Sequence, residues 1–314
     1  MELRRFGKTD LEVSVLGFGG APVGFLDTDR AEVARILNTL LDRGVNLIDT
    51  AAGYPGSEEA IGAAVGHRRD DYVLVSKCGQ AFDDLDGAEW SATVIRQTVD
   101  RALRRLRTDH LDVMLLHTCD LEVLRQGEAL GALVAAREAG KVRFVGYSGD
   151  NEAAVHAAAL ADVAVIETSV SICDQANIDG VLRQAERHDV GVLAKRPVAN
   201  AAWKDLADQR GMYATYAKTY TERFSKMAIA PADLGFDDAA AAVWPEIALR
   251  FTLSQPGVTT AIVGTTKPSH VEQNLAFSAK GPLAPEAAAQ LRRAFARAES
   301  ADGVTWEELR EMIV

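Results

Sequence analysis

Residues 46–50 read NLIDT, residues 72–77 read YVLVSK and residues 111–117 read LDVMLLH. Each stretch is a short apolar run that ends in a polar side chain, and an amphipathic, helix-like segment separates it from the next. Short continuous apolar runs indicate strands that are buried on both faces, as in parallel sheets. Parallel strands present their carboxyl ends on one side, so we expect the polar residues at these ends to converge.

The same alternation of strand and helix continues along the chain. We expect the first strand at LEVSVLGFGG, residues 11–20, a helix at residues 29–44, and five such units before residue 162. Three further strands are expected at VAVIETS (163–169), GVLAKRP (191–197) and TTAIVG (259–264). Strands separated by helices of this length need right-handed crossovers. Eight such units that close on themselves predict an α/β fold of the (β/α)8 TIM barrel type, as one domain over residues 1–314.

An open, doubly wound sheet is the alternative fold. Its dinucleotide fingerprint is missing, because GFGGAP at residues 17–22 has proline where the last glycine is required. We interpret this glycine cluster as a tight turn at the end of the first strand.

Two parts of the chain lie outside the alternation. Residues 198–238, after the seventh strand, form a long insert that is rich in aromatic residues. This insert is either a lid or binding loop, or a partly helical excursion that packs its aromatic side chains against the barrel. After Gly281 we expect extra C-terminal helices, with WEELREMIV at residues 306–314 as a candidate closing helix.

Composition excludes several classes of function. The 314 residues carry a formal net charge of −11, which disfavours a nucleic-acid partner or an anionic membrane surface. No secretory signal follows the first residues, and no apolar run approaches the roughly 20 residues needed to cross a bilayer. The three cysteines form no CxxC pair and leave an odd count, which favours a reduced compartment, and we expect the cytoplasm.

Four strand-end residues predict proton-transfer chemistry. The hydroxyl of Tyr54 is a poor acid, with a reference pKa of about 10, unless a nearby cation favours the phenolate. Lys77 is suited to be that cation, and Asp49 is placed to supply the counter-charge that a buried lysine needs. His117, on the next strand, can donate a hydrogen bond to a substrate oxygen. Such a site would polarise and protonate a carbonyl group.

The same residues resemble motifs of the aldo-keto reductase family. The resemblance is carried by RRFGKTDLEVSVLGFGGAPVG (4–24), IDTAAGYPGSEEAIG (48–62), VSKCG (75–79) and LDVMLLHTCD (111–120). It covers nearly the whole chain and retains all four catalytic positions, which are Asp49, Tyr54, Lys77 and His117. It implies an extended nicotinamide cofactor, hydride transfer to a carbonyl carbon, and a small carbonyl or alcohol substrate. Tyr54 would then supply the proton to the carbonyl oxygen.

The resemblance also implies cofactor contacts. Ser148 corresponds to the serine that holds the carboxamide, with Gly149 in place of the usual asparagine and Glu167 in place of the usual glutamine. A carboxylate accepts a hydrogen bond from an amide but cannot donate one as glutamine does. Lys195, which Arg196 follows, replaces the aromatic residue that often stacks on the nicotinamide. Its aliphatic stem could cover the ring, or its ammonium group could meet a phosphate.

AIVGTTKPSHVEQN, at residues 261–274, resembles the phosphate loop on the adenine side of the cofactor. A helix N-terminus favours anions, and the loop supplies a lysine, so NADPH is favoured and NADH remains open. The residues assigned to this loop are Gly264, Thr265, Thr266, Lys267, His270 and Asn274.

Other functions are compatible with parts of the pattern. A dehydrogenase of a small sugar or alcohol that prefers NAD is one, and a nicotinamide-binding sensor or partner barrel with little turnover is another. A lyase or isomerase on the same fold is a third. His117, Cys119 and Asp120 are possible metal ligands, but no second cluster completes a tetrahedral site, so no metal is expected.

Overall fold

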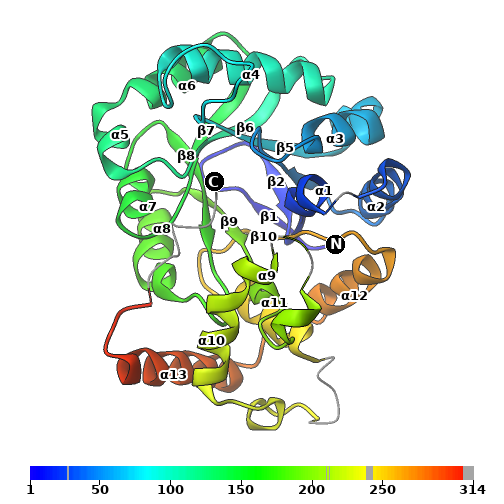
Figure 1. Cartoon of the computed structure of the whole chain (residues 1–314), viewed down its shortest axis with the longest axis vertical. Helices are drawn as coiled ribbons and strands as arrows, with labels where there is room; N and C mark the ends of the chain where they lie inside the picture. Colours follow the sequence, from blue (N-terminus) through cyan, green and yellow to red (C-terminus); the bar gives the residue numbers. More distant parts are fainter. Residues whose placement is uncertain (27, 210, 212, 238–242, 307–314) are drawn as a thin grey trace.

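The computed structural model describes residues 1–26, 28–209, 211, 213–237 and 243–306. Within these residues the centre of the molecule is a closed barrel of parallel strands, in which each strand pairs with its neighbour in the chain and β10 closes on β3 (Figure 1). The barrel strands are β3 (Leu16–Gly19), β4 (Leu47–Asp49), β5 (Val73–Cys78), β6 (Leu111–His117), β7 (Val142–Ser148), β8 (Val163–Ser169), β9 (Gly191–Lys195) and β10 (Thr260–Val263). The predicted (β/α)8 barrel is confirmed.

Helices surround the barrel on its outside (Figure 1). Those between or after barrel strands are α1 (Ala21–Phe25), α2 (Arg30–Asp42), α3 (Ser57–Val65), α4 (Ala92–Leu106), α5 (Leu121–Gln126), α6 (Glu128–Glu138), α7 (Asn151–Ala158), α8 (Arg183–Arg187), α11 (Trp244–Leu253), α12 (Pro268–Ala279) and α13 (Pro285–Asp302). Polar side chains cap the first turns of two helices. The carboxylate of Asp29 accepts hydrogen bonds from the backbone N–H groups of Ala31 and Glu32 at the start of α2, and the hydroxyl of Ser91 accepts one from the backbone N–H of Val94 at the start of α4.

Two helical segments are irregular. Residues 121–138 form two helices, α5 and α6, rather than one, because Gly127 between them adopts a left-handed conformation with φ of 75°. The helical segment after β8 begins with a π-helical turn, η2 (Ile178–Leu182), before α8 continues it. Both irregularities lie on the outside of the barrel, so they leave the strand order unchanged.

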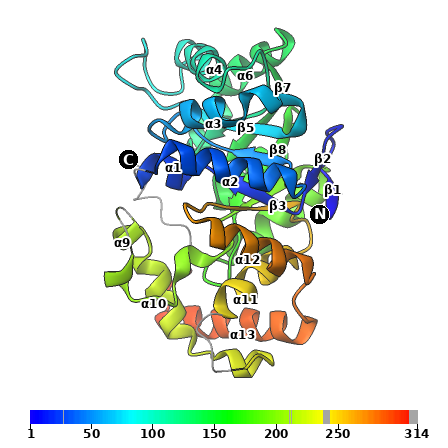
Figure 2. The ribbon, with the colours of Figure 1, turned by 90° about the vertical axis from the view of Figure 1, so that its right-hand side faces the viewer.

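The N-terminus forms a hairpin that covers the amino end of the barrel. The first strand expected over residues 11–20 is wrong in part: β2 (Glu12–Ser14) pairs antiparallel with β1 (Leu3–Arg5), and only β3 enters the barrel. A Cβ atom on Gly7 would lie 2.1 Å from the backbone nitrogen of Gly191, so only glycine allows the hairpin to approach this closely. Figure 2 shows the hairpin at one end of the barrel and α9 at the other.

The described residues form two apolar cores. The larger core fills the space between the strands and the surrounding helices. A smaller one fills the barrel interior, where strand side chains such as Leu47, Val75 and Val113 meet Phe6 and Val13 of the hairpin. The interior is therefore packed with side chains rather than open, as expected for a barrel of this size.

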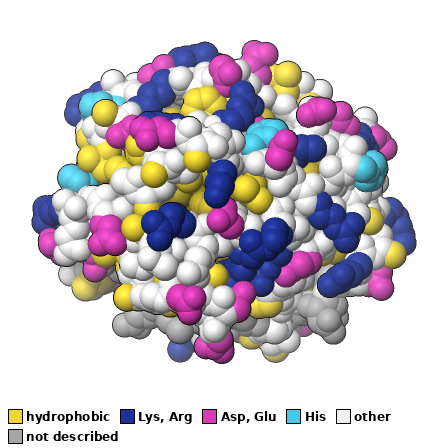
Figure 3. Space-filling view, turned by 90° about the horizontal axis from the view of Figure 1, so that it is seen from above, with side chains coloured by type: hydrophobic (Ala, Val, Ile, Leu, Met, Phe, Trp, Pro, Cys, Tyr) yellow, Lys and Arg dark blue, Asp and Glu magenta, His cyan; other side chains and the backbone are white. Residues whose placement is uncertain are grey.

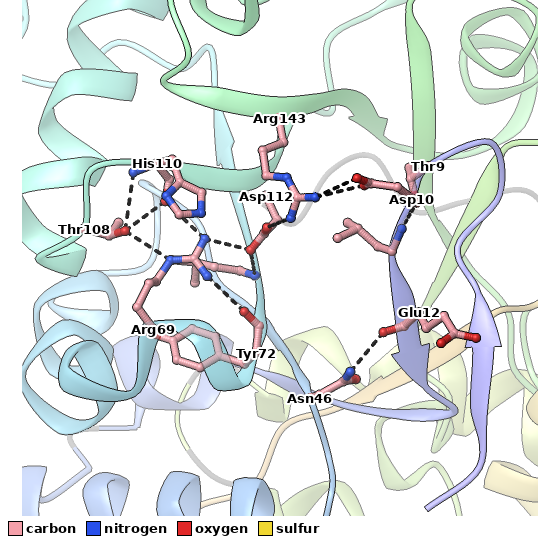
Figure 4. Close-up of polar contacts among 12 residues, drawn as sticks. Thr9, Asp10, Glu12, Asn46, Arg69, Tyr72, Thr108, His110, Asp112 and Arg143 are labelled. Carbon is pink, nitrogen blue, oxygen red and sulfur yellow. Dashed lines mark hydrogen bonds and ion pairs between the residues drawn. The ribbon is translucent and has the colours of Figure 1, made fainter.

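A polar network, which we call the floor network, ties the hairpin to the amino ends of the strands (Figure 4). Its members are Asp10, Arg69, Asp112 and Arg143. The buried carboxylate of Asp112 accepts from Nη2 of Arg69 at 2.7 Å and from Nη1 of Arg143 at 2.7 Å. Arg143 then donates its Nη2 to Asp10 at 2.9 Å. Buried Asp112 of β6 thus contacts Arg143 of β7, and Arg143 links both strands to the hairpin.

The insert is partly helical, with α9 (Tyr213–Tyr216), α10 (Lys218–Met227) and the short 3-10 turns η3 (Ala199–Ala201), η4 (Leu206–Asp208) and η5 (Pro231–Leu234). Its aromatic side chains pack on α11. The ring of Trp203 stacks on the ring of Trp244, and the ring of Phe224 meets Trp244 edge-on with the ring centres 4.7 Å apart. This is the aromatic packing expected of a helical excursion, and the excursion also lines the mouth of the barrel. The closing helix expected near the C-terminus falls almost wholly on residues 307–314, outside the described residues.

The surface carries interspersed charges. On the face shown in Figure 3, basic and acidic side chains alternate without forming one large field of either sign. No helix among the described residues is both long enough and apolar enough to span a membrane.

Candidate functional site

The structure brings the four predicted strand-end residues together at the carboxyl end of the barrel. Asp49 ends β4, Lys77 lies in β5, and His117 ends β6, while Tyr54 follows β4 in a loop. The Nζ atom of Lys77 donates to Oδ1 of Asp49 at 2.6 Å and lies 5.3 Å from the centre of the Tyr54 ring. The rings of Tyr54 and His117 meet edge to face with their centres 6.0 Å apart. The sequence pattern therefore corresponds to one spatial cluster.

Glu167, which the resemblance assigned to the cofactor, also reaches this cluster. Its Oε2 atom lies 3.1 Å from the Nζ atom of Lys77. Lys77 donates in addition to the backbone carbonyl of Thr50 at 3.0 Å. The side chains of Lys77, Asp49 and Glu167 are 0%, 2% and 3% exposed, so one ammonium group and two carboxyl groups share a buried site. We call these three residues the carboxylate–lysine cluster.

Burial and neighbouring charge act in opposite directions on this cluster. Burial alone lowers the pKa of Lys77, but the two carboxyl groups outweigh it, so that the pKa of Lys77 is raised above its ordinary value and the ammonium stays charged. Burial, together with the charge of Glu167, holds the pKa of Asp49 well above its ordinary range even though Lys77 opposes the shift. The cluster therefore retains its cation, and burial favours a proton on Asp49.

The two aromatic members are held in their neutral forms. Burial raises the pKa of Tyr54 to about 12, while Lys77 acts to lower it. Burial, with Lys77 and Lys195 adding to it, keeps the pKa of His117 well below its ordinary value of 6.5. The Nδ1 atom of His117 is buried and has no hydrogen-bond partner among the described residues. A neutral imidazole here can donate one hydrogen bond to a ligand.

The predicted carboxamide contacts lie on neighbouring strands. Ser148 ends β7 beside His117, and it pairs in register with Glu167 of β8. A Cβ atom on Gly149 would lie 2.4 Å from the hydroxyl of Tyr147, which donates to the carbonyl of Cys119 at 2.7 Å. The glycine after Ser148 is thus required by packing, so no side chain at that position can hold a carboxamide.

Lys195 and Arg196 are engaged by other protein groups. The Nζ atom of Lys195 lies 2.7 Å from Oδ2 of buried Asp150, rather than extending as a free ammonium group. Arg196 donates to the hydroxyl of Ser169 at 2.8 Å and stacks over the ring of Tyr216 at 4.9 Å. Both residues still line the cavity, but through side chains that are held in place.

The predicted phosphate loop lies between β10 and α12. The hydroxyl of Thr265 accepts from the backbone N–H of Lys267 at 3.1 Å and lies 3.3 Å from Nδ1 of His270. Burial lowers the pKa of His270, and the charges of Lys267 and Lys204 lower it further. Lys204 therefore lies close enough to the loop to add a second positive charge. Sequence reasoning missed it because the insert has no periodic pattern from which its position could be read.

A cavity of about 390 Å³ connects the cluster with the phosphate loop. Lys77 and Asn274 do not line it, but the other predicted site residues do: Asp49, Tyr54, His117, Ser148, Glu167, Lys195, Arg196, Gly264, Thr265, Thr266, Lys267 and His270. The insert adds wall residues that were not predicted: Asn200, Lys204, Asp208, Gln209, Tyr213 and Tyr216.

Metal and thiol chemistry find little support in the described structure. Among the described residues, no group of three or more potential ligands is placed to hold a metal ion. The thiols of Cys78, Cys119 and Cys173 are free and buried. Burial raises the pKa of the Cys119 thiol to about 12, which leaves it unreactive at neutral pH.

Known proteins resemble this chain over most of its length. Residues 15–295 match the family model described as the aldo/keto reductase family. The oxidoreductase YqkF of Bacillus subtilis is 27% identical over 286 residues, which cover 88% of this chain and 90% of that protein. L-galactose dehydrogenase of Arabidopsis thaliana is 27% identical over 290 residues, with 88% of each chain covered.

A solved structure also resembles this chain in sequence and fold. The holo form of an aldo-keto reductase from Bacillus halodurans is 26% identical and superimposes with a TM-score of 0.78, over 94% of this chain and 96% of that chain. Members of this family are oxidoreductases that use nicotinamide cofactors and act on small carbonyl substrates. Since the family model covers most of its length, this chain belongs to the aldo/keto reductase family.

Proposed function

We propose that the protein is an NADPH-dependent oxidoreductase that interconverts an aldehyde or ketone and its alcohol, with Tyr54 as the general acid and base. The observation that carries this proposal is the contact between Lys77 and its neighbours. The Nζ atom of Lys77 is fixed by Asp49 at 2.6 Å and lies 5.3 Å from the Tyr54 ring centre, with the His117 ring against the same tyrosine. The acid and the hydrogen-bond donor therefore face one cavity, with the cation held beside the ring of the acid.

The pKa of Tyr54 suits proton donation. A pKa of about 12 keeps the hydroxyl protonated at neutral pH, so that it is available to an oxygen that develops alkoxide character. Lys77 stabilises the phenolate that remains, and neutral His117 can donate to the same substrate oxygen. When bound, the nicotinamide supplies or accepts the hydride. In the reverse direction Tyr54 acts as the base that removes the alcohol proton.

The cofactor preference rests on the charges at the far end of the cavity. Lys267 and Lys204 both lie close enough to His270 to lower its pKa, and the N-terminus of α12 begins beside them. Two ammonium groups and a helix N-terminus suit a dianionic phosphate ester. NADPH carries such a group on its adenosine ribose, and NADH does not. We therefore expect a higher kcat/KM with NADPH.

The substrate class is narrowed by the insert. Asn200, Asp208 and Gln209 add polar groups to the wall, while Tyr213 and Tyr216 add aromatic faces. Polar groups next to aromatic faces suit a hydroxylated substrate, and a relative is named for a sugar, L-galactose. Sugar lactols therefore belong in the substrate panel beside simple aldehydes and ketones.

The test is turnover by Tyr54→Phe. Removal of the hydroxyl should lower kcat about 10²- to 10⁴-fold, the usual contribution of a positioned acid, while NADPH binding is retained. Reduced-nicotinamide absorbance measures turnover, and a fluorescence titration measures binding. Tyr72→Phe is the matched control, because it removes a hydroxyl at the amino end of the barrel. Equal turnover in Tyr54→Phe and Tyr72→Phe would remove Tyr54 from the mechanism.

A further inference from the structure

Glu167 reaches the carboxylate–lysine cluster from the opposite side of the barrel. It lies in β8, whereas Asp49 lies in β4 and Lys77 in β5, and the closed strand order separates β4 from β8 by three strands. The two carboxyl groups therefore meet the same ammonium group from across the barrel, at 2.6 Å and 3.1 Å. Their meeting is a property of the closed fold, since no local segment contains both.

The charges in this cluster do not balance if both acids are ionised. One buried ammonium group then faces two buried carboxylates, and like charges that are both buried resist joint ionisation. The nearby Lys195 already lies 2.7 Å from another buried carboxylate, that of Asp150. Tyr54 and His117, which face the cluster from the loop after β4 and from β6, are neutral near pH 7. A proton on one of the two acids restores the balance.

We propose that Asp49 and Glu167 hold one proton between them in the free protein. Binding of an oxidised nicotinamide causes the pair to lose this proton, whereas binding of a reduced nicotinamide does not. The inference rests on the proposed function, because it takes the cavity beside Glu167 as the nicotinamide site. Glu167 acts through Lys77 and the cofactor as a positioning residue. It sets which redox form of the cofactor the site favours.

The physical reason is the charge of the ring. The oxidised nicotinamide ring is a cation and the reduced ring is neutral, while the rest of the two cofactors is the same. Glu167 lines the cavity, so a cationic ring can take the place of the proton as the missing positive charge. Burial and the charge of Glu167 raise the pKa of Asp49, which is the direction that favours a shared proton before binding. Binding of the oxidised form and loss of the proton are then linked.

The experiment measures proton release by the full-length protein. A pH indicator in weakly buffered solution reports release on addition of NADP+ or NADPH at a series of pH values. The ribose phosphate titrates in both cofactors, so its contribution cancels in the difference. We expect release approaching about one proton with NADP+ and much less with NADPH. Over the pH values at which NADP+ binding releases the proton, the affinity for NADP+ should rise up to about tenfold per pH unit. The affinity for NADPH should change little.

Glu167→Gln is the matched variant, because it keeps the size of the side chain and removes the second acid. The difference in proton release between the two cofactors should vanish, and NADP+ should bind more weakly. Asp49→Asn removes the other acid and should also abolish the difference, which keeps the test available if one variant does not fold. Both readouts are independent of turnover.

Two outcomes would overturn the inference. The first is equal proton release with NADP+ and NADPH in the wild-type protein. The second is a difference that persists unchanged in Glu167→Gln and in Asp49→Asn. If either occurs while carbonyl substrates are still turned over, the proposed function stands and this inference alone fails. Binding of neither cofactor would overturn both.

Discussion

The two ends of the barrel carry opposite arrangements of buried charge. At the amino end, one buried carboxylate, that of Asp112, lies between the guanidinium groups of Arg69 and Arg143. At the carboxyl end, one buried ammonium group, that of Lys77, lies between the carboxyl groups of Asp49 and Glu167. The first arrangement surrounds one buried anion with cations, and the second surrounds one buried cation with anions.

The difference decides which end can respond to protons. Arginine does not lose its proton in a protein, so the cations of the floor network stay charged, and exposed Asp10 pairs with the second guanidinium group, that of Arg143. Carboxyl groups can gain a proton, and the cluster at the other end is buried. The amino end therefore serves as a static brace, and the carboxyl end has the properties of a site that handles protons.

Loss of Lys77 should have the largest effect. In Lys77→Met the phenolate of Tyr54 loses its cation, and turnover is expected to fall at least about 10²-fold. Asp49 would then lose the cation that opposes the upward shift of its pKa, so its folded-state pKa would rise further above the unfolded value. The folded state then binds more protons, and its free energy of unfolding should decrease as pH rises from about 5 to 8. Urea titrations at several pH values measure this slope, and a flat profile would contradict the comparison.

Loss of Asp112 should show the opposite behaviour. Asp112→Asn leaves two guanidinium groups without their shared carboxylate, and these groups cannot neutralise themselves. Because Arg69 and Arg143 are partly exposed, we expect a loss of about 2 to 3 kcal/mol in the free energy of unfolding, less than for a fully buried pair. The loss should be nearly independent of pH between about 5 and 8. Cofactor binding, measured by fluorescence, should not change, and a weakened affinity would link the two ends.

These contrasts show which features a sequence reveals. The barrel strands were predictable because strands buried on both faces read as continuous apolar runs, and the four catalytic candidates were found because they stand at strand ends. The break at Gly127 was also present in the sequence, since a glycine within a helical pattern can end a helix.

Other features depend on closure of the barrel or on an irregular segment. Glu167 was recognised by its position in the chain, but its contact with Lys77 is made across the barrel, so no spacing along the chain encodes it. Lys204 lies in an insert without periodicity, and the part played by the N-terminal hairpin follows from the close approach of Gly7 to Gly191.

The smallest effect should come from the edge of the floor network. Asp10→Asn removes an exposed partner of Arg143 and leaves Asp112 in place. Exposed ion pairs contribute little, so the free energy of unfolding should fall by no more than about 1 kcal/mol. Chemical denaturation beside Asp112→Asn makes the comparison directly. An equal loss in the two variants would mean that the hairpin contact, and not the buried carboxylate, dominates this network.

The hairpin that covers the amino end also has a kinetic consequence. In the described part of the chain, Phe6 and Val13 of the hairpin fill the amino end of the barrel. A molecule that reaches Tyr54 therefore enters and leaves at the carboxyl end, beside the insert. A dinucleotide and a small substrate that share one passage cannot come and go independently. Whichever lies deeper must arrive first and depart last. Under the proposed function, we therefore expect an ordered sequence of binding and release, which product-inhibition patterns would display.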